Sequence, residues 1–390
     1  MKNKKAYSIL VAIFFLLVII TDFHYKYLLF YGVNQMKLTF IAKLIVGITL
    51  IAIMLLNTKP KREIIYLISF LGICCMISLW SLNSLGIDSS IYVMSQYFFG
   101  VVVMLFFLSD QILLNTNYLQ KIVESIICIN IICIILGYVF DIHVFQTYYG
   151  KRFGYSGIFK STATASYFYM FCLGFLLVKK HKTKITYLFI VTTIVSAFLI
   201  GSKTLYAFVI FCLAIILIKK IGKRQNIIPI KAFYMFSTLL TIVICLITFI
   251  PLISLNEILR VVLEEDGIIT AFFSYRDQHV MNAYANISED YNNVNFLFGG
   301  LGYINRLTEI AIVDAFLTFG LIGTIIYVKL ITINLPKITH NTTKLIMLVI
   351  AGLIFLRGNF FYYPSAMYIS LAIFAITLNE INTKSKLKKA

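Results

Sequence analysis

Apolar runs of about 17–25 residues, the length needed to cross a bilayer, recur along almost all of the 390-residue chain. Hydrophobic residues make up 60% of the sequence, against about 45–50% in an average soluble domain. The runs are continuous rather than alternating, which disfavours a transmembrane barrel. The sequence therefore predicts an all-α, polytopic integral membrane protein, a single domain over residues 1–390 with about twelve transmembrane helices.

The predicted spans follow the apolar runs. The last apolar block is interrupted by RGNFFYYP and is therefore divided into two helices. The first run follows three lysines and resembles a signal peptide, but it has no small-residue cleavage site, so we expect a retained helix. The predicted spans are 7–23, 38–56, 64–82, 91–108, 122–140, 162–178, 185–200, 205–218, 232–251, 309–328 and the two parts of 344–378.

The placement of charge predicts the orientation of these spans. The chain has 34 Lys and Arg against 16 Asp and Glu, a net charge of +18. Most of the cations fall in the loops and ends on one side, which is typical of cytoplasmic loops. Both termini are therefore predicted to be cytoplasmic. A basic face toward anionic lipid explains the charge without a nucleic-acid partner.

Cysteine and histidine give no sign of a bound metal. All seven cysteines lie inside apolar runs, where cysteine behaves as a small hydrophobe. No pair of them has metal-ligand spacing with a histidine. The sequence thus predicts neither a disulfide framework nor a metal site, and no cofactor.

One long polar segment, residues 255–308, separates two predicted spans and is expected to form a large extracytoplasmic loop. Within it, Ser274-Tyr-Arg-Asp277 predicts the capped start of a helix that continues to Ile287. Arg276 then lies in the first turn, where free N–H groups and the helix dipole favour an anion and a guanidinium fork suits phosphate. An ion pair with a neighbouring acid is the alternative. The apolar side of this helix is predicted to consist of Phe273, Val280, Tyr284 and Ile287.

Several further cations fall on the disfavoured outer side. Lys26, Lys37 and Arg260 are interpreted as solvated or snorkelling side chains. For the others a binding role and an ordinary structural role both stay open. Arg152 lies among glycines that allow close approach of a ligand, Lys203 lies in a tight turn between two helices, and Arg357 directly follows a helix. The outer cations considered for anion binding are Arg152, Lys203, Arg276, Arg306 and Arg357.

Two acids begin the predicted helix 309–328. Glu309 is expected at its mouth and Asp314 roughly 7 Å deeper, at about 1.5 Å per residue. An acid at that depth is costly unless it faces a cavity or a partner, so both residues are candidates for a functional role. A structural pair with one of the outer arginines is the alternative.

Four groups of residues between Leu119 and Gly323 carry a resemblance to a known family. They are Arg152-Phe-Gly-Tyr-Ser-Gly157-Ile-Phe159, Gly201-Ser-Lys-Thr204, Ser274-Tyr-Arg276 with Phe298-Gly-Gly-Leu-Gly302, and Glu309…Asp314…Gly320…Gly323. In order and spacing they resemble the motifs of Wzy-type polysaccharide polymerases and their relatives, the O-antigen ligases. Thr162 departs from the family, which commonly has an asparagine there. Ligases tend to carry a histidine where this chain has Glu309, which favours a polymerase.

The resemblance implies a bacterial membrane glycosyltransferase without a metal. It would join oligosaccharide repeat units carried on undecaprenyl pyrophosphate into capsule, O-antigen or exopolysaccharide at the outer face of the cytoplasmic membrane. Arg152, Lys203 and Arg276 would bind the pyrophosphate, and Glu309 or Asp314 would be the base for the acceptor hydroxyl. Arg306 and Arg357 are added by position only. Implied partners are the lipid-linked donor and acceptor, membrane lipid, a chain-length regulator and a flippase.

Three other interpretations stay open. A ligase would transfer finished glycan to a lipid or protein. A lipid-linked glycan flippase or other transporter would be expected to show charges deep in several spans and an internal repeat, neither of which is evident here. A non-catalytic scaffold is the third.

Overall fold

The computed structural model describes residues 2–33, 37–57, 62–81, 87–109, 116–147, 153–179, 183–222, 257–273, 275–300, 308–333, 341–356 and 360–387. Over these residues the fold is helical, with no strand and one isolated bridge between Gln146 and Tyr155, which confirms the all-α class. The helices are α1 (Lys2–Phe30), α2 (Lys37–Asn57), α3 (Arg62–Ser81), α4 (Ile87–Phe107), α5 (Thr116–Phe140), α6 (Thr162–Val178), α7 (Lys184–Ile200), α8 (Lys203–Gly222), α10 (Glu257–Glu265), α11 (Gly267–Phe273), α12 (Arg276–Asp290), α13 (Asn293–Phe298), α14 (Ala311–Thr332), α15 (Asn341–Leu356) and α16 (Pro364–Leu387), with short 3-10 helices η1 at His143–Phe145 and η2 at Phe360–Tyr362.

Length and composition fit a membrane protein. In the described part of the chain, five helices are long and apolar enough to cross a bilayer: Ala6–Phe30, Leu38–Leu56, Arg62–Trp80, Tyr118–Phe140 and Ala311–Thr332. Shorter apolar helices occupy Ile91–Phe107, Thr162–Val178, Lys184–Ile200, Lys203–Ile216, Thr343–Phe355 and Pro364–Leu378. The predicted span 232–251 lies outside the described residues. The number of twelve spans therefore stays a prediction.

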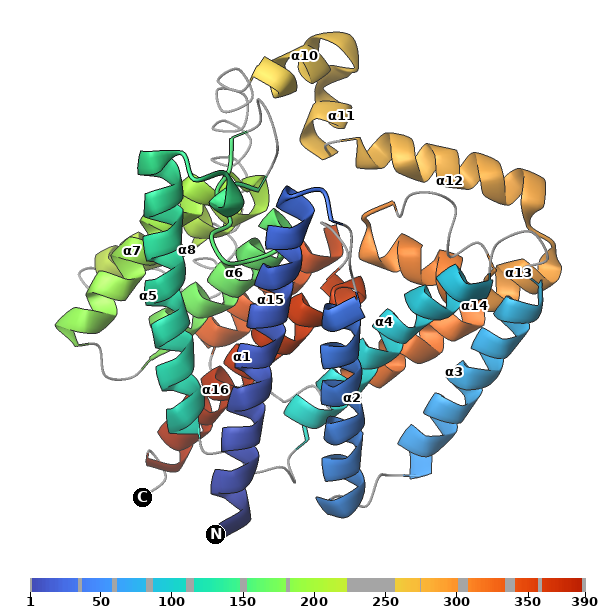
Figure 1. The fold of residues 1–390 in the computed structure, drawn as a ribbon, viewed down its shortest axis with the longest axis horizontal. Helices are drawn as coiled ribbons and strands as arrows, with labels where there is room; N and C mark the ends of the chain where they lie inside the picture. The colour runs from blue at the N-terminus through green and yellow to red at the C-terminus, as the bar shows by residue number, and fades with distance from the viewer. Residues whose placement is uncertain are drawn as a thin grey trace.

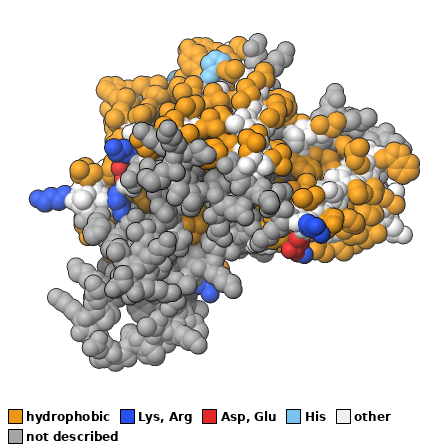
Figure 2. All heavy atoms as spheres, turned by 90° about the horizontal axis from the view of Figure 1, so that it is seen from below, with side chains coloured by type: hydrophobic (Ala, Val, Ile, Leu, Met, Phe, Trp, Pro, Cys, Tyr) orange, Lys and Arg blue, Asp and Glu red, His pale blue; other side chains and the backbone are white. Residues whose placement is uncertain are grey.

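The core is built around α6 and α16, which pack against each other. Almost every residue of α6 is buried, as expected of a helix that is apolar on all sides. Helices α1, α4 and α5 contact α16, and α3 packs along α14. Large apolar side chains such as Trp80, which is 82% exposed, point outward from the bundle, where lipid would cover them. Figure 2 shows the same surface character: apolar side chains cover most of the described face, with Lys and Arg at scattered places.

The polar segment lies at one end of the bundle. The start of α1 and the end of α16 lie together at the opposite end (Figure 1). At the end away from both termini, α10 and α11 lie above the bundle, and α12 runs crosswise to α1 and α2 (Figure 1). The segment predicted as a loop therefore contains α10, α11, α12 and α13, of which the sequence predicted only the helix beginning near Arg276.

Three predicted helix boundaries are wrong for local reasons. The loop predicted from His24 is helical, because no breaker occurs until Gly32, whose φ of +75° ends α1. The helix predicted from Glu309 begins at Ala311, because Glu309 has a φ of +59°. At the start of α12, where a serine cap was predicted, Tyr275 is the N-cap, with a φ of +68° and no side-chain capping bond, and Ser274 itself lies outside the described residues. On α12, Tyr284 is exposed rather than part of an apolar side.

Helix α14 is broken at Gly320. This residue has φ +66° and ψ −172°, a conformation open essentially only to glycine. The break lets the end of α13 approach backbone to backbone, since a Cβ on Gly320 would collide with the amide nitrogen of Gly299. The freed carbonyls find new donors: Leu317 O accepts from the Tyr291 hydroxyl at 3.1 Å and from Gly300 N at 3.3 Å. The break therefore attaches the polar segment to one of the helices that are long and apolar enough to cross a bilayer.

The segment 153–161, called the α6 loop below, is held on both sides by the chain itself. Gly154 lies against the turn between α7 and α8, where a Cβ on Gly201 would meet Phe153 O at 2.7 Å. Tyr155 N donates to Leu199 O at 2.9 Å. On the other side, Asn130 Oδ1 accepts from Ile158 N at 2.8 Å. Two of the glycines predicted to admit a ligand here admit other parts of the chain instead: Gly154 the backbone of Ile200 and Gly157 the side chain of Asn130. Gly150 lies outside the described residues.

Candidate functional site

An ion pair joins α12 to the residues just before α14. Arg276 is the first residue of α12, and its Nη2 lies 2.6 Å from Oε2 of Glu309. The arginine side chain is 13% exposed and the glutamate 48%. One face of the carboxylate is thus open to solvent, while the guanidinium is largely enclosed.

The backbone on both sides of this ion pair is strained. Tyr275 and Glu309 have positive φ values, which cost non-glycine residues of order 1–3 kcal/mol each. Among the described residues only Asp141 shares this feature. Such strain persists only where surrounding structure imposes it, and it clusters at functional sites.

Asp314 fixes the backbone around Glu309. The Asp314 side chain is fully buried, and its Oδ1 accepts from Thr308 N at 2.7 Å and from Thr308 Oγ1 at 2.8 Å. Thr308 Oγ1 in turn accepts from Ile310 N at 3.2 Å. The residues before and after Glu309 are therefore tied to Asp314. This arrangement suits a positioning role, because a buried carboxylate cannot reach a substrate hydroxyl without rearrangement.

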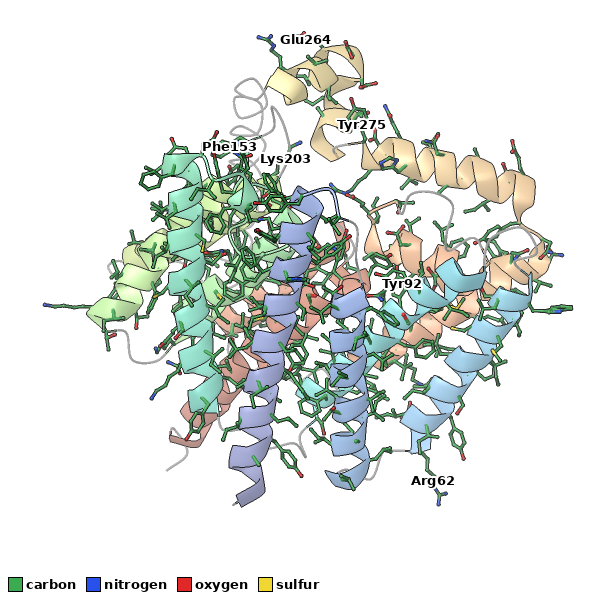
Figure 3. All side chains as sticks on the ribbon, in the orientation of Figure 1. Arg62, Tyr92, Phe153, Lys203, Glu264 and Tyr275 are labelled. Carbon is green, nitrogen blue, oxygen red and sulfur yellow. The ribbon has the colours of Figure 1, made fainter. Side chains whose placement is uncertain are left out.

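Lys203 attaches the polar segment at a second point. It is the first residue of α8, directly after Gly201, which has a left-handed φ of +71°, and Ser202. Its Nζ donates to Ala271 O in α11 at 2.7 Å. Figure 3 shows Phe153, Lys203 and Tyr275 at the same end of the bundle.

A short run of contacts links Lys203 to Arg276. Ala271 follows Thr270, whose Oγ1 donates to Asp277 Oδ2 at 2.6 Å. Asp277 is the neighbour of Arg276 in α12. The structure thus brings Lys203, Arg276 and Glu309 onto one network through α11 and α12. Arg152, Arg306 and Arg357 lie outside the described residues.

A charged cluster at the end of α1 was missed by the sequence interpretation. Lys26 was expected to be solvated or snorkelling, which is wrong: it is 6% exposed and donates to Ser156 Oγ at 2.9 Å and Gly157 O at 2.8 Å. One turn before it, Asp22 pairs with Lys43 of α2 at 3.1 Å. The available signal was two charged residues four apart inside an apolar run.

Comparison of the chain with models of known protein families, with curated proteins and with solved structures found no match. Within the described residues, no three His, Cys, Asp or Glu side chains gather into a metal-binding group. The fold defines an all-α protein with helices long and apolar enough to span a membrane, with a polar segment fixed at one end.

Proposed function

We propose that this chain is a membrane glycosyltransferase that polymerises undecaprenyl-pyrophosphate-linked oligosaccharide repeat units into surface polysaccharide at the outer face of the bacterial cytoplasmic membrane. The observation that carries the proposal is the contact between Arg276 and Glu309. It pairs a cation suited to phosphate with a half-exposed carboxylate at the end of the bundle where the polar segment lies. The sequence resemblance to Wzy-type polymerases supports the same assignment.

In the proposed reaction the acceptor hydroxyl oxygen attacks the anomeric carbon of the donor sugar. The bond between that carbon and the pyrophosphate oxygen breaks, and undecaprenyl pyrophosphate leaves with the electron pair. Glu309 takes the proton of the hydroxyl, while Arg276 stabilises the charge that develops on the leaving group. Lys203 and Arg152 are proposed as further pyrophosphate contacts, and Asp314 positions Glu309.

The resting ion pair gives this scheme an order of events. A pyrophosphate carries more negative charge than one carboxylate, so the donor competes with Glu309 for Arg276. When the donor binds, the carboxylate is released and can accept a proton. The base is then available only while the leaving group is in place.

Translocation of lipid-linked glycan is the second candidate, and the break in α14 favours it. Broken helices in transporters present freed carbonyls to ions or substrate. Here the freed carbonyls accept instead from the protein: Leu317 O from Tyr291 and Gly300, and Thr318 O from Ser78 Oγ at 3.3 Å. The break is therefore better explained as an attachment point for α13.

Two substitutions test the proposed function. Surface glycan is analysed on gels from cells that carry Arg276→Ala or Glu309→Ala at normal protein levels. Loss of an electrostatic contact at a reacting centre typically lowers kcat by about 10²–10³, so both variants should give short chains. Ordinary long ladders in both variants would remove this site assignment.

Deletion of the gene product distinguishes the polymerase from the ligase. Without a polymerase, single repeat units should be attached to the cell surface. Without a ligase, long chains should accumulate unattached. Movement of labelled lipid-linked glycan across vesicles without chain growth would instead identify a flippase.

A further inference from the structure

Two ammonium groups and one carboxylate, those of Lys43, Lys160 and Asp22, gather where α1, α2 and the α6 loop meet. Asp22 and Lys26 lie one turn apart on α1, and both are buried. Lys43 of α2 pairs with Asp22 at 3.1 Å. Lys160 of the α6 loop lies with its Nζ 4.2 Å from the ring centroid of Tyr25. With these three groups charged, two positive charges against one negative leave a local net charge of one.

Lys160 has unused hydrogen-bonding capacity. Within the described part of the chain its ammonium makes no hydrogen bond or ion pair. Its contact with the face of the Tyr25 ring leaves its N–H groups able to donate hydrogen bonds to a ligand. Burial, together with nearby Lys43 and against the opposing effect of Asp22, lowers the pKa of Lys160 to about 8. Besides these two, the titratable group that faces it is Tyr25 of α1. At neutral pH Lys160 is therefore mostly charged.

The cluster is organised before any ligand arrives. Lys26 is anchored by Ser156 Oγ and Gly157 O, and Ser156 Oγ donates to Phe159 O at 2.9 Å. The α6 loop that carries Lys160 is thus fixed to α1 directly and to α5 through Asn130. Preorganised donors lose little entropy when they bind an anion.

We propose that Lys43 and Lys160, with Lys26 as anchor and Asp22 as a competing carboxylate, form a second phosphate-binding site, for a phosphomonoester or pyrophosphate head group. The site begins about 6 Å from the end of α1, at about 1.5 Å per residue, a depth that suits the head group of a lipid-linked phosphate. It does not depend on the proposed reaction, because none of its residues takes part in that chemistry.

The experiment uses the full-length chain in detergent with Arg276→Ala, so that α12 does not contribute to binding. Inorganic pyrophosphate is titrated by calorimetry, and undecaprenyl pyrophosphate binding is followed by native mass spectrometry. Lys160→Gln should weaken binding about tenfold, the usual effect of losing a charge-assisted hydrogen bond. Asp22→Asn should strengthen binding, since it removes the competing charge. Arg260→Gln, which removes an exposed cation from α10, should leave binding unchanged.

The outcomes separate the two sources of phosphate. If inorganic pyrophosphate binds and displaces the lipid, the head group alone is sufficient. If only the lipid binds, with the same dependence on Lys160 and Asp22, the ligand is lipid-linked. Binding that is absent from the parent chain, that survives Lys160→Gln, or that Asp22→Asn weakens would overturn the proposal. Glycan length in cells tests the proposed function separately.

Discussion

Alanine in place of Gly320 tests whether the break in α14 holds the polar segment. The backbone there has φ +66° and ψ −172°, which alanine cannot adopt without strain. The new Cβ would also collide with backbone atoms of Leu297, Phe298 and Gly299. The chain can respond in two ways: it keeps the break under backbone strain, or α14 straightens and α13 no longer packs against it.

Both outcomes lower the free energy of unfolding of the variant by a similar amount. Retaining the break costs about 1–3 kcal/mol in backbone strain, before the collision is relieved. Straightening α14 gives up the two hydrogen bonds that Leu317 O accepts, at about 1–1.5 kcal/mol each, together with the packing of α13. A loss of about 3–5 kcal/mol is expected. At about 2 °C per kcal/mol for a large chain, Tm should fall by about 6–10 °C.

Thermal unfolding in detergent measures this shift, and Gly352→Ala is the matched control. Gly352 lies inside α15, and a Cβ there meets nothing within 4 Å. Its substitution should leave Tm unchanged or slightly raised, because alanine is the better helix former. Equal Tm values for the two variants would refute the reasoning. A second check is the double variant Gly299→Ala/Gly320→Ala. Both new Cβ atoms disturb the same backbone contact between Gly299 and Gly320, so the Tm loss of the double variant should be smaller than the sum of the two single losses.

Two predictions concern single charged groups. In Asp314→Asn the amide oxygen can still accept from Thr308, so glycan length should be nearly normal if Asp314 only positions Glu309. If Asp314 were the catalytic base, the same substitution would lower the reaction rate by about 10²–10⁴. Gels of surface glycan distinguish these two outcomes. For Lys160, folding lowers the pKa from 10.5 to about 8, so between pH 8 and 10.5 the unfolded chain binds more protons than the folded chain. The free energy of unfolding should therefore rise with pH over this range, by at most about 3 kcal/mol. Below pH 8 both states are protonated and the cost of burying the charge is present in full. Tm measured from pH 7 to 10.5 should show the rise in the parent chain and not in Lys160→Met, and parallel curves would contradict it.

The helices were predictable where local signals mark both ends. Residues 162–178 were predicted as a span and form α6, which begins after Ser161, whose side chain caps Thr164 N, and ends before Lys179. The end of α1 was placed too early, because polar residues from His24 onward were interpreted as a loop although nothing there breaks a helix. Hydropathy measures where a chain leaves the apolar core, and a helix can continue beyond that point.

Features that depend on distant residues could not be predicted. The break at Gly320 needs Gly299 against it, and a glycine inside an apolar run gives no sign of such a partner. The spacing of Asp22 and Lys26 hinted at a charged pair in α1, but the burial of Lys26 depends on Ser156 and Gly157, far along the chain. By contrast, the cost of an acid at Asp314 was predictable from depth alone, although its bond to Thr308 was not.

The contacts of the proposed site also explain why its cations need not be exposed. Arg276 is enclosed and already bound to Glu309, so an anion can reach it only by exchanging with a carboxylate. In such an exchange one anion replaces another beside Arg276, so no unpaired cation is buried at any step. An unpaired guanidinium at this position would be costly in the resting protein. The ion pair therefore stabilises the unliganded state and, in the proposed reaction, makes release of the base conditional on binding of the leaving group.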